Sequence, residues 1–506
     1  MFRKILLALL SGVLFSLAWP ASGFPFLLFV AFVPLLILES EQPKFLFFYS
    51  FLAFVLWNSL TTYWIVHATL FGVVMAVLIN ALLMAGTFSL FSWVKNRLGD
   101  KRGWWVFVCL WLSFEYLHLN WDLSWPWLTL GNGFANYPST VQWYEYTGVL
   151  GGSLWVLLAN VLLFKAWQKR TFYLPIAWVV IPIIASIFIK PNLSERDTVK
   201  VVVVQPNIDP YNEKFGGLTA DEQLEKMLAL AETKVDSTTD YLIGPETALV
   251  NSIWENQLEH SPAILRLQQF LQQYPQLHII VGASTYKLFE AGEELSETAR
   301  QFPRRESYYD AFNTAIQIDT SGIQLYHKSK LVPGVEMMPF TAVLKHFKSL
   351  SVNLGGVSGS LGSQDHRAVF SSTKAQVAPV ICYESIYGEY MLDYVRNGAD
   401  LITIITNDGW WKDTPGYRQH LAYASLRAIE TRRAIARSAN TGTSAFIDAL
   451  GTISQPTAWW QEAVIAEELP IYKGLTFYTI YGNYLGRLAG FVAAILLLYG
   501  IAKRKE

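Results

Sequence analysis

Long apolar stretches fill the first third of the chain and return once near its end. They lie near residues 4–19, 25–39, 44–66, 69–94, 104–119, 143–165, 172–189 and 485–502. A straight membrane-spanning helix needs about 20 apolar residues, so several of these stretches are short for one. The pattern predicts a polytopic α-helical membrane domain with eight spans, seven in residues 1–190 and the eighth, with a cytoplasmic tail, in residues 485–506.

Basic residues between these stretches predict the orientation of the spans. With the N-terminus inside, the cytoplasmic side carries Arg3, Lys4, Lys44, Lys95, Arg97, Lys101, Arg102, Lys165, Lys169, Arg170, Lys503, Arg504 and Lys505. The opposite loops, near 20–24, 66–69 and 120–142, contain no Lys or Arg, which places residues 191–484 outside the cytoplasm. The first stretch has an alternative interpretation as a cleaved signal peptide, but cleavage would remove the first crossing from the charge pattern.

Residues 191–484 have the pattern of a water-soluble α/β domain. Strand-like runs occur at 199–204, 241–243, 278–282, 314–318, 377–382, 401–406 and 445–448, and the polar stretch 290–306 predicts an exposed loop. Helices with recognisable starts lie between some of the strands. Thr219 and Glu222 have the spacing of a capping box, and Ser261 precedes Pro262 as an expected N-cap. Alternating strands and helices predict a layered α/β architecture.

Composition agrees with a division into membrane and soluble parts. Hydrophobic residues make up 52% of the chain and charged residues 16%, against about 25% charged in ordinary soluble domains. The 19 Trp and 25 Tyr residues suit the aromatic belts of membrane interfaces. A net charge of −1 gives no reason to expect a nucleic-acid partner, because binding to phosphates requires a basic surface.

The two cysteines lie in different surroundings. Cys109 falls inside an apolar stretch, where a small buried side chain is the expected role. Cys382 ends a strand-like run outside the cytoplasm, and its domain has no second cysteine for a disulfide. Ligands bind at strand ends in α/β folds, so Cys382 is a candidate nucleophile, with an inert buried thiol as the alternative.

A thiol nucleophile needs a base and a group that stabilises an oxyanion. Glu246 follows the run 241–243, and Lys328 and Lys330 follow the strand around 314–318. Either motif alone is weak evidence, because Glu and Lys usually lie on solvated surfaces. Together with Cys382 in one α/β domain, they are more specific.

These motifs resemble the nitrilase superfamily, whose sites combine Glu, Lys and Cys in this chain order, and within it the bacterial apolipoprotein N-acyltransferases. The resemblance implies an αββα sandwich in which Glu246 of P-E-T is the general base. Lys328 of K-x-x-L-V-P is then the catalytic lysine, with Lys330 as its neighbour, and Cys382 of I-C-Y-E is the nucleophile.

The resemblance also assigns supporting residues. Glu336 resembles a further acidic residue that the family needs, and Tyr383 and Glu384 resemble its pair after the nucleophile. Trp410 lies in a loop, 407–411, that resembles the one following the family's cysteine. Trp410, with Trp411, Phe215 and Phe340, is a candidate for a lipid-facing rim, although ordinary packing explains any one of them equally well.

The membrane part carries the resemblance too. Residues 124–131 look like the family's P-W-x-x-x-G loop. Two departures stand out. The chain has Gly334 and Val335 where the family reads Phe-Gly before its Glu, and His118 where a membrane motif has Arg three residues after its Glu, here Glu115. Glu115 and His118 lie near the outer end of a span, where a functional and a simple interfacial role are equally expected.

The function implied is acyl transfer from a phospholipid to the α-amine of the N-terminal diacylglyceryl-cysteine of an apolipoprotein, the last step of lipoprotein maturation. It runs by ping-pong chemistry through a thioester on Cys382, and needs neither cofactor nor metal. The location implied is the bacterial cytoplasmic (inner) membrane, with residues 191–484 on the periplasmic side. A membrane-anchored amidase or nitrilase-type hydrolase, and an inactive lipid- or lipoprotein-binding protein, are the alternatives.

Overall fold

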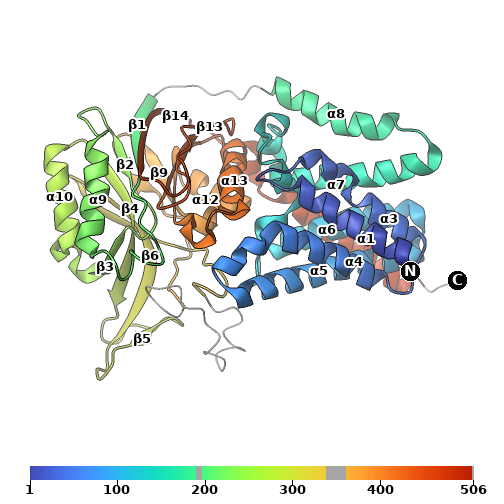
Figure 1. Cartoon of the computed structure of the whole chain (residues 1–506), viewed down its shortest axis with the longest axis horizontal. Coiled ribbons are helices and arrows are strands. Elements are labelled where there is room, and N and C mark those ends of the chain that lie inside the picture. The colour runs from blue at the N-terminus through green and yellow to red at the C-terminus, as the bar shows by residue number, and fades with distance from the viewer. Residues whose placement is uncertain (190–196, 338–359, 504–506) are drawn as a thin grey trace. The chain divides into compact units, whose positions relative to one another are not determined.

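A computed structural model describes residues 1–189, 197–337 and 360–503 of the chain (Figure 1). The chain forms two compact units. A helical unit comprises Met1–Pro191, Thr414–Glu430 and Thr476–Glu506, and a sheet-containing unit comprises Asn192–Asp413 and Thr431–Leu475. The sequence pattern did not predict that residues 414–430 pack with the helical unit.

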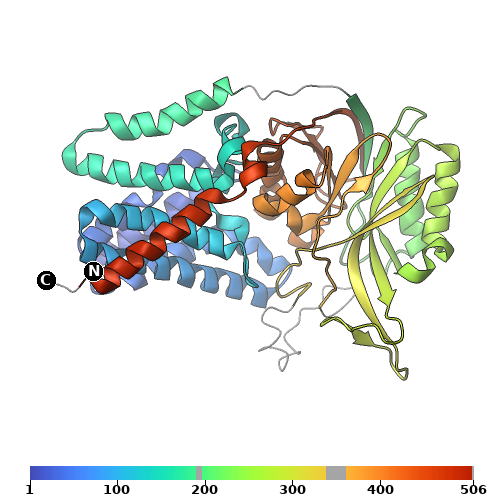
Figure 2. The same cartoon turned by 180° about the vertical axis from the view of Figure 1, so that it is seen from behind.

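Every apolar stretch expected to cross the membrane is helical. The helices are α1 (Phe2–Ala18), α2 (Leu28–Ala31), α3 (Val33–Ser40), α4 (Leu46–Thr62), α5 (Leu70–Leu98), α6 (Asp100–His118), α7 (Tyr144–Lys169), α8 (Tyr173–Phe188) and α15 (Tyr484–Ala502). The unit also contains α13 (Pro415–Thr431) and α14 (Phe477–Tyr481). Figure 2 shows α15, in red, lying along this bundle, where it packs against α6 and α5.

Four helices in the described part of the chain are long and apolar enough to span a membrane. They are Leu46–His67, Leu70–Leu98, Tyr144–Lys169 and Tyr484–Ala502. The helices at Pro25–Ser40 and Tyr173–Phe188 are apolar but shorter, and α1 has 17 residues. Helix α6 has 19 residues but begins with the charged run 100–102. The expectation of eight spans is therefore met by length and composition at four positions.

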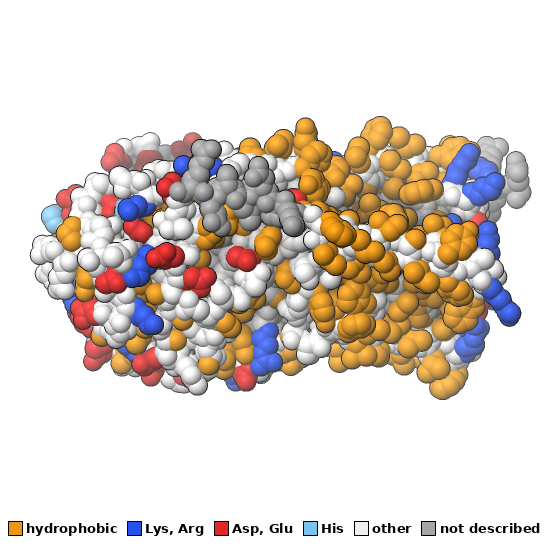
Figure 3. Space-filling model, turned by 90° about the horizontal axis from the view of Figure 1, so that it is seen from above, with side chains coloured by type: hydrophobic (Ala, Val, Ile, Leu, Met, Phe, Trp, Pro, Cys, Tyr) orange, Lys and Arg blue, Asp and Glu red, His pale blue; other side chains and the backbone are white. Residues whose placement is uncertain are grey.

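Polar contacts join the helix ends that carry basic residues. Arg3 pairs with Glu41 at 2.5 Å, Arg97 donates to the carbonyl oxygen of Gly500 at 3.1 Å, and Gln42 donates to Asn96 at 2.9 Å. Figure 3 shows Lys and Arg side chains at one end of the helical unit, next to a band of hydrophobic side chains. The charge alternation read from the sequence thus corresponds to one basic end of the bundle.

Large apolar side chains point outward from the helices of this unit. Examples are Leu10 on α1, Phe71 on α5, Ile184 on α8 and Phe491 on α15, which are 48–69% exposed. So many exposed apolar side chains on one surface indicate contact with lipid rather than with water.

The sheet-containing unit has two sheets. The first joins β1 (Asp197–Gln205), β2 (Tyr241–Ile243), β3 (Leu249–Trp254), β4 (His278–Leu288), β5 (Arg300–Gln301), β6 (Tyr308–Asp319), β7 (Gly322–His327) and β14 (Ala463–Ile471). Its main order is β14-β1-β2-β4-β6-β5, with β3 paired to β4 and β7 to β6. Helices α9 (Ala220–Glu232) and α10 (Pro262–Gln273) share a hydrophobic core with this sheet.

The second sheet has the order β13-β12-β11-β10-β9-β8. Its strands are β8 (Phe370–Ser371), β9 (Gln376–Ile381), β10 (Leu401–Thr406), β11 (Ala434–Ala439), β12 (Ala445–Ile447) and β13 (Ile453–Ser454), and helix α12 (Gly388–Arg396) follows β9. The two sheets face each other, because β1 packs on β11 and β6 on β9. The Ser438 hydroxyl on β11 donates to the Val204 carbonyl on β1 at 2.9 Å.

All seven expected strand runs correspond to strands, with Cys382 and Asp448 one residue past the ends of β9 and β12, but the helix starts are only partly as predicted. The Thr219 hydroxyl and the Glu222 carboxylate form the expected capping box of α9. Helix α10 begins at Pro262 as expected, yet the Ser261 side chain makes no capping hydrogen bond. Pro262 has no N–H and has its φ preset, so this helix starts without that cap.

Strand direction brings the candidate residues to one edge of each sheet. Strands β1, β2 and β4 are parallel, and β7 runs in the same direction because β4 and β7 are both antiparallel to β6. Glu246 after β2 and Lys328 after β7 therefore leave the first sheet on the same side. In the second sheet β9 and β10 are parallel, so Cys382 and Thr406 share an edge as well.

Candidate active site

Glu246 lies in a tight turn after β2. Thr247, the next residue, has φ +48°, a left-handed conformation that costs a β-branched residue free energy. The backbone of the turn packs closely against Gly282 of β4, where a Cβ atom would lie 2.5 Å from the Thr247 nitrogen and 2.6 Å from the Glu246 Cα. Only glycine at position 282 lets the chain place Glu246 there.

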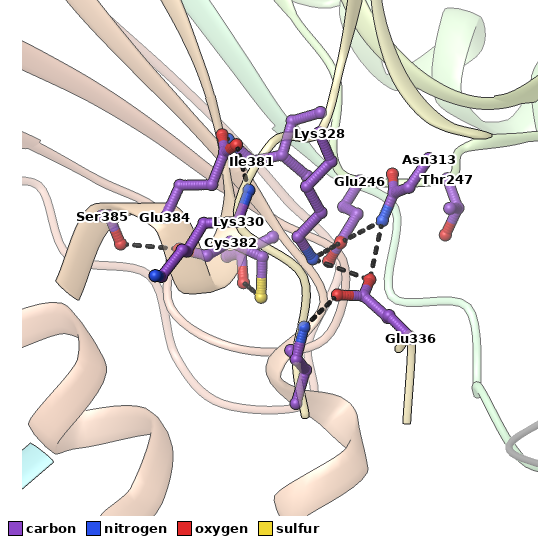
Figure 4. A network of polar contacts seen from close by, with 12 residues as sticks. Glu246, Thr247, Asn313, Lys328, Lys330, Glu336, Ile381, Cys382, Glu384 and Ser385 are labelled. Atoms are coloured by element: carbon purple, nitrogen blue, oxygen red, sulfur yellow. Dashed lines mark hydrogen bonds and ion pairs between the residues drawn. The ribbon is translucent and has the colours of Figure 1, made fainter. Parts of the chain in front are cut away.

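Lys328 is the first residue after β7, and its ammonium group joins two carboxylates. Its backbone N–H donates to the Asn313 carbonyl on β6 at 2.8 Å. Its Nζ lies 3.2 Å from Glu246 Oε1 and 2.8 Å from Glu336 Oε1 (Figure 4). The side chain is 1% exposed, so the two carboxylates replace its lost hydration.

Cys382 directly follows β9 and has φ +49°. Its Sγ lies 3.2 Å from the Thr406 hydroxyl at the end of β10, and the same hydroxyl lies 2.9 Å from Asp408 Oδ1. The hydroxyl has one proton, so it donates to only one of these atoms at a time. Asp408 also pairs with Arg437 at 2.7 Å, both fully buried.

The charges around the thiol favour a neutral Cys382 beside an ionised Glu246. Burial opposes the charge on Glu246, but Lys328, Asn313 and Lys214 together hold its pKa below the ordinary value. Burial also opposes the charge on Lys328, and there the carboxylates of Glu246 and Glu336 raise the pKa well above its ordinary value.

The pKa of the Cys382 thiol is raised, whereas many reactive cysteines have a lowered pKa. Desolvation and the Glu246 carboxylate raise the pKa of Cys382 well above the ordinary value, and Lys328 lowers it by less. A thiol held in this way needs a base to become a nucleophile, and the Glu246 carboxylate is close enough to affect its pKa.

Glu336 completes the carboxylate pair, and Asn313 holds both members. Glu336 Oε2 accepts the Val332 N–H at 2.8 Å, which fixes the carboxylate beside Lys328. The Asn313 amide donates to Glu246 Oε1 at 2.8 Å and to Glu336 Oε1 at 3.2 Å. Sequence reasoning missed Asn313, although a single amide within the apolar strand 311–316 was a signal for it.

Glu384 points away from the lysine–carboxylate group and ties two segments together. Its carboxylate is fully buried. It accepts hydrogen bonds from the backbone N–H groups of Ile381 at 2.8 Å, Ser329 at 2.7 Å and Lys330 at 3.2 Å. It thereby connects the strand end that carries Cys382 to the segment after Lys328. The neighbouring Tyr383 is buried, and its hydroxyl accepts a hydrogen bond from Tyr387 at 3.0 Å.

Trp410 lies in the short helix η9 (Asp408–Trp411) after β10. The Tyr211 hydroxyl donates to its carbonyl oxygen at 2.8 Å, and the two rings meet edge to face at 5.3 Å. Phe215, another candidate for a lipid-facing rim, is 46% exposed. Phe340 lies outside the described residues.

The motif 124–131 organises the helical unit. Glu115 accepts the Leu130 N–H at 3.0 Å, and the Trp127 indole donates to Gln419 on α13 at 2.6 Å. A Cβ on Gly131 would lie 1.9 Å from the Val149 carbonyl oxygen, so the close approach needs glycine. His118 accepts a hydrogen bond from the Trp121 indole at 2.9 Å. These contacts give the motif a packing role within this unit.

No group of three or more His, Cys, Asp and Glu side chains suited to a metal ion occurs in ranges 1–189, 197–337 and 360–503. The site brings together a thiol, two carboxylates and a buried ammonium group.

Comparison with known proteins matches both parts of the chain. Residues 11–162 match the apolipoprotein N-acyltransferase N-terminal domain, and residues 200–472 match the carbon-nitrogen hydrolase family. An apolipoprotein N-acyltransferase from Chlorobaculum tepidum is 29% identical over 99% of this chain and 97% of its own. One from Geobacter metallireducens is 28% identical over 95% and 92%.

Among solved structures, an amidase variant of the nitrilase superfamily from Nesterenkonia has a TM-score of 0.37 and 14% identity, over 55% of this chain and 93% of that chain. This likeness is too low to support an argument. The family matches do not depend on it, since one covers more than half of the chain and the other covers most of the helical part before it. The chain belongs to the carbon-nitrogen hydrolase family of the nitrilase superfamily, and within it to the apolipoprotein N-acyltransferases.

Proposed function

We propose that this protein transfers an acyl chain from a phospholipid to the α-amine of the N-terminal diacylglyceryl-cysteine of apolipoproteins. The observation that carries the proposal is the contact of the Lys328 ammonium with Glu246 and Glu336 beside the strand-end thiol of Cys382. The relatives named apolipoprotein N-acyltransferase, which align along nearly the whole chain, support the choice of substrates.

The first half-reaction loads the enzyme. Glu246 takes the thiol proton as Cys382 Sγ attacks the ester carbonyl carbon of the phospholipid. The Lys328 ammonium and a backbone N–H near Tyr383 stabilise the oxyanion that forms. The intermediate collapses with loss of the lysophospholipid oxygen, which takes the proton from Glu246, and the acyl chain remains on Cys382 as a thioester.

The second half-reaction unloads it. The neutral α-amine of the apolipoprotein attacks the thioester carbonyl, and Glu246 removes a proton from the amine nitrogen. The C–S bond then breaks, the amide is released, and the Cys382 thiolate regains its proton from Glu246. Glu246 thus acts as base and then acid in both halves, which suits a carboxylate that the buried ammonium groups keep ionised at rest.

Supporting residues fit around this cycle. Glu336 helps to keep Lys328 charged while Glu246 is transiently protonated, because it makes the shorter of the two contacts with Nζ. Glu384 accepts hydrogen bonds from the segment that carries Lys328 and from the one that carries Cys382, and so keeps the two segments together. Trp410, Trp411 and Phe215 are candidates for contact with lipid chains.

The membrane arrangement belongs to the same proposal. We infer eight spans, with the catalytic domain in residues 191–484 on the periplasmic side of the bacterial inner membrane. The basic end of the helical unit supports the orientation, since positive charge marks the cytoplasmic side. A hydrolase that uses water as acceptor is not favoured, because the named relatives transfer acyl chains to apolipoproteins. An inactive binding protein would have no use for the Glu246, Lys328 and Cys382 set.

Mass spectrometry of Cys382 after incubation with phospholipid tests the proposal. We expect a mass increase of one acyl chain on the Cys382 peptide, and its loss when a diacylglyceryl-cysteine peptide is added, with the acyl chain appearing on that peptide. Cys382→Ser should insert and fold normally but lose transfer. A transfer-competent Cys382→Ser variant, or a wild-type enzyme that releases only free fatty acid, would show that the proposal is wrong.

A further inference from the structure

A second lysine is buried next to Glu246. Lys214 lies in the loop between β1 and α9 and is 3% exposed. Its Nζ donates to the carbonyl oxygen of Glu246 at 3.3 Å and to the Thr247 hydroxyl. Lysine is among the residues most rarely buried, so its placement beside the proposed base calls for a physical reason.

Hydrogen bonds to the backbone N–H and to the backbone carbonyl of Lys214 both fix its position. Its N–H donates to the Asp209 carbonyl oxygen at 2.9 Å, and its carbonyl oxygen accepts from the Gln223 amide of α9 at 2.8 Å. Gln223 is itself 1% exposed. A surface lysine that happened to fold inward would not be held by buried contacts of this kind, so the loop is built to deliver an ammonium group to this point.

The ammonium group acts where the chain is strained. Thr247 is held at φ +48°, a conformation that a threonine does not keep without support. Lys214 donates hydrogen bonds to the carbonyl oxygen of the residue before Thr247, which is Glu246, and to the Thr247 hydroxyl itself. It therefore fixes the turn from which the Glu246 side chain projects.

We propose that Lys214 is a positioning residue for Glu246, which clamps the strained turn and supplies a second positive charge that keeps the carboxylate ionised and ready to take the Cys382 proton. The inference rests on the proposed function in one respect, the role of Glu246 as base to Cys382.

The charges facing Glu246 come from several elements. They are Lys214 before α9 and Lys328 after β7, with Glu336 on the far side of Lys328 and Cys382 at the end of β9; Asp408, at the end of β10, acts on Cys382. Two positive side chains, Lys214 and Lys328, and two negative ones, Glu246 and Glu336, thus form one connected group next to the thiol, and the Asp408 charge is already paired to Arg437. Removing Lys214 leaves this group with one excess negative charge, which favours protonation of Glu246. Burial lowers the pKa of Lys214 itself to about 8, so it is charged over the acidic range in which Glu246 titrates.

Three substitutions separate charge from hydrogen bonding. Lys214→Met loses both, Lys214→Gln keeps a donor without charge, and Lys214→Arg keeps the charge. Lys226→Met is the matched control, because Lys226 on α9 pairs with Glu462 at 2.8 Å and, among the described residues, forms no ion pair with Glu246 or Glu336. The measurement is the rate of alkylation of Cys382 by iodoacetamide from about pH 2.5 to pH 8, read from the Cys382 peptide of the full-length protein in detergent, so that the range includes pH values below the ordinary pKa of Glu.

We expect the acid limb of the alkylation profile to move up by about one pH unit in Lys214→Met and Lys214→Gln, the low end of the effect of a close opposite charge. Lys214→Arg and Lys226→Met should keep the wild-type limb. Thr247→Ala, which removes one partner but leaves the ammonium group, should also keep it.

A wild-type acid limb in Lys214→Gln would overturn the proposal, because the role would then be only that of a hydrogen-bond donor. A shift in Thr247→Ala as large as in Lys214→Gln would overturn it too, since the backbone and not the charge would be responsible. Alkylation needs no lipid substrate, so failure of the acyl-transfer proposal would leave these outcomes unchanged and readable.

Discussion

Replacement of Glu384 by glutamine tests how the two halves of the site are joined. The change keeps the shape of the side chain but turns one acceptor oxygen into a donor group. At the position of Oε1 the new amide would face the N–H groups of Ser329 and Lys330, and at the position of Oε2 it would face the N–H of Ile381. Neither orientation avoids a donor facing a donor in a site that water does not reach.

The orientation of the glutamine amide that costs less free energy sets the expected loss of stability. With the amide at the Oε2 position, one hydrogen bond to a charged group is lost, worth about 1.5–3 kcal/mol, and the buried Ile381 N–H stays unpaired, at about 1–3 kcal/mol. Tyr394, 3.2 Å from Oε2, also donates there but can turn to accept from the new amide. The loss is therefore about 2.5–6 kcal/mol, and at about 2 °C per kcal/mol for a unit of about 270 residues Tm should fall by about 5–12 °C.

Thermal unfolding of the full-length protein in detergent, followed by tryptophan fluorescence, measures this change. Glu468→Gln is the matched control, because Glu468 on β14 is exposed, and its Tm should stay within about 1 °C of the wild type. We also expect slower alkylation of Cys382, since the segment after Lys328 loses its connection to the end of β9. A Tm for Glu384→Gln equal to that of the control would refute the idea that this carboxylate ties the two segments.

Two further predictions concern the group around Lys328. Asn313→Asp would set a third carboxylate against Glu246 and Glu336, and we expect thioester formation to fall at least tenfold at pH 7 through like-charge repulsion; an unchanged single-turnover rate would contradict the contacts of the Asn313 amide. The pH profile of thioester formation on Cys382, which involves no amine, should be flat on the acid side down to about 4.3, the ordinary Glu value, because Lys328, Asn313 and Lys214 hold the pKa of Glu246 below it. Below that pH the carboxylate takes up a proton, and both activity and the stability that its ionised form contributes are lost. An acid limb centred near pH 6 would exclude Glu246 as the base.

Local patterns were enough to predict the elements and the candidate residues. Runs of β-branched and apolar residues, such as Val201–Val204, predicted all seven strands that were named, because such runs fit a sheet buried on both faces. Short edge strands such as β8 and β13, and β11 with the buried Arg437, were missed, since they lack that signature. Within residues 1–189, 197–337 and 360–503, only four helices meet the length and composition of a span, because α1, α6, α8 and Pro25–Ser40 are shorter or more polar than the apolar count suggested.

The sequence by itself determined that an apolar helical part is joined to an α/β part and that Glu246 and Cys382 each follow a predicted strand. Lys328, which was expected after the strand around 314–318, instead follows β7, a strand that was not predicted. A residue's place relative to its own strand depends on its neighbours along the chain, which the sequence displays. Contacts across the fold depend on strand order, direction and register, which only the tertiary structure decides. Those contacts set Lys214 against the Glu246 turn, placed the Asn313 amide between two carboxylates and turned Glu384 toward three backbone N–H groups. They also packed residues 414–430 with the helical unit. The side chains that hold the proposed base in place are therefore visible only in the folded molecule, because packing brings together groups tens of residues apart.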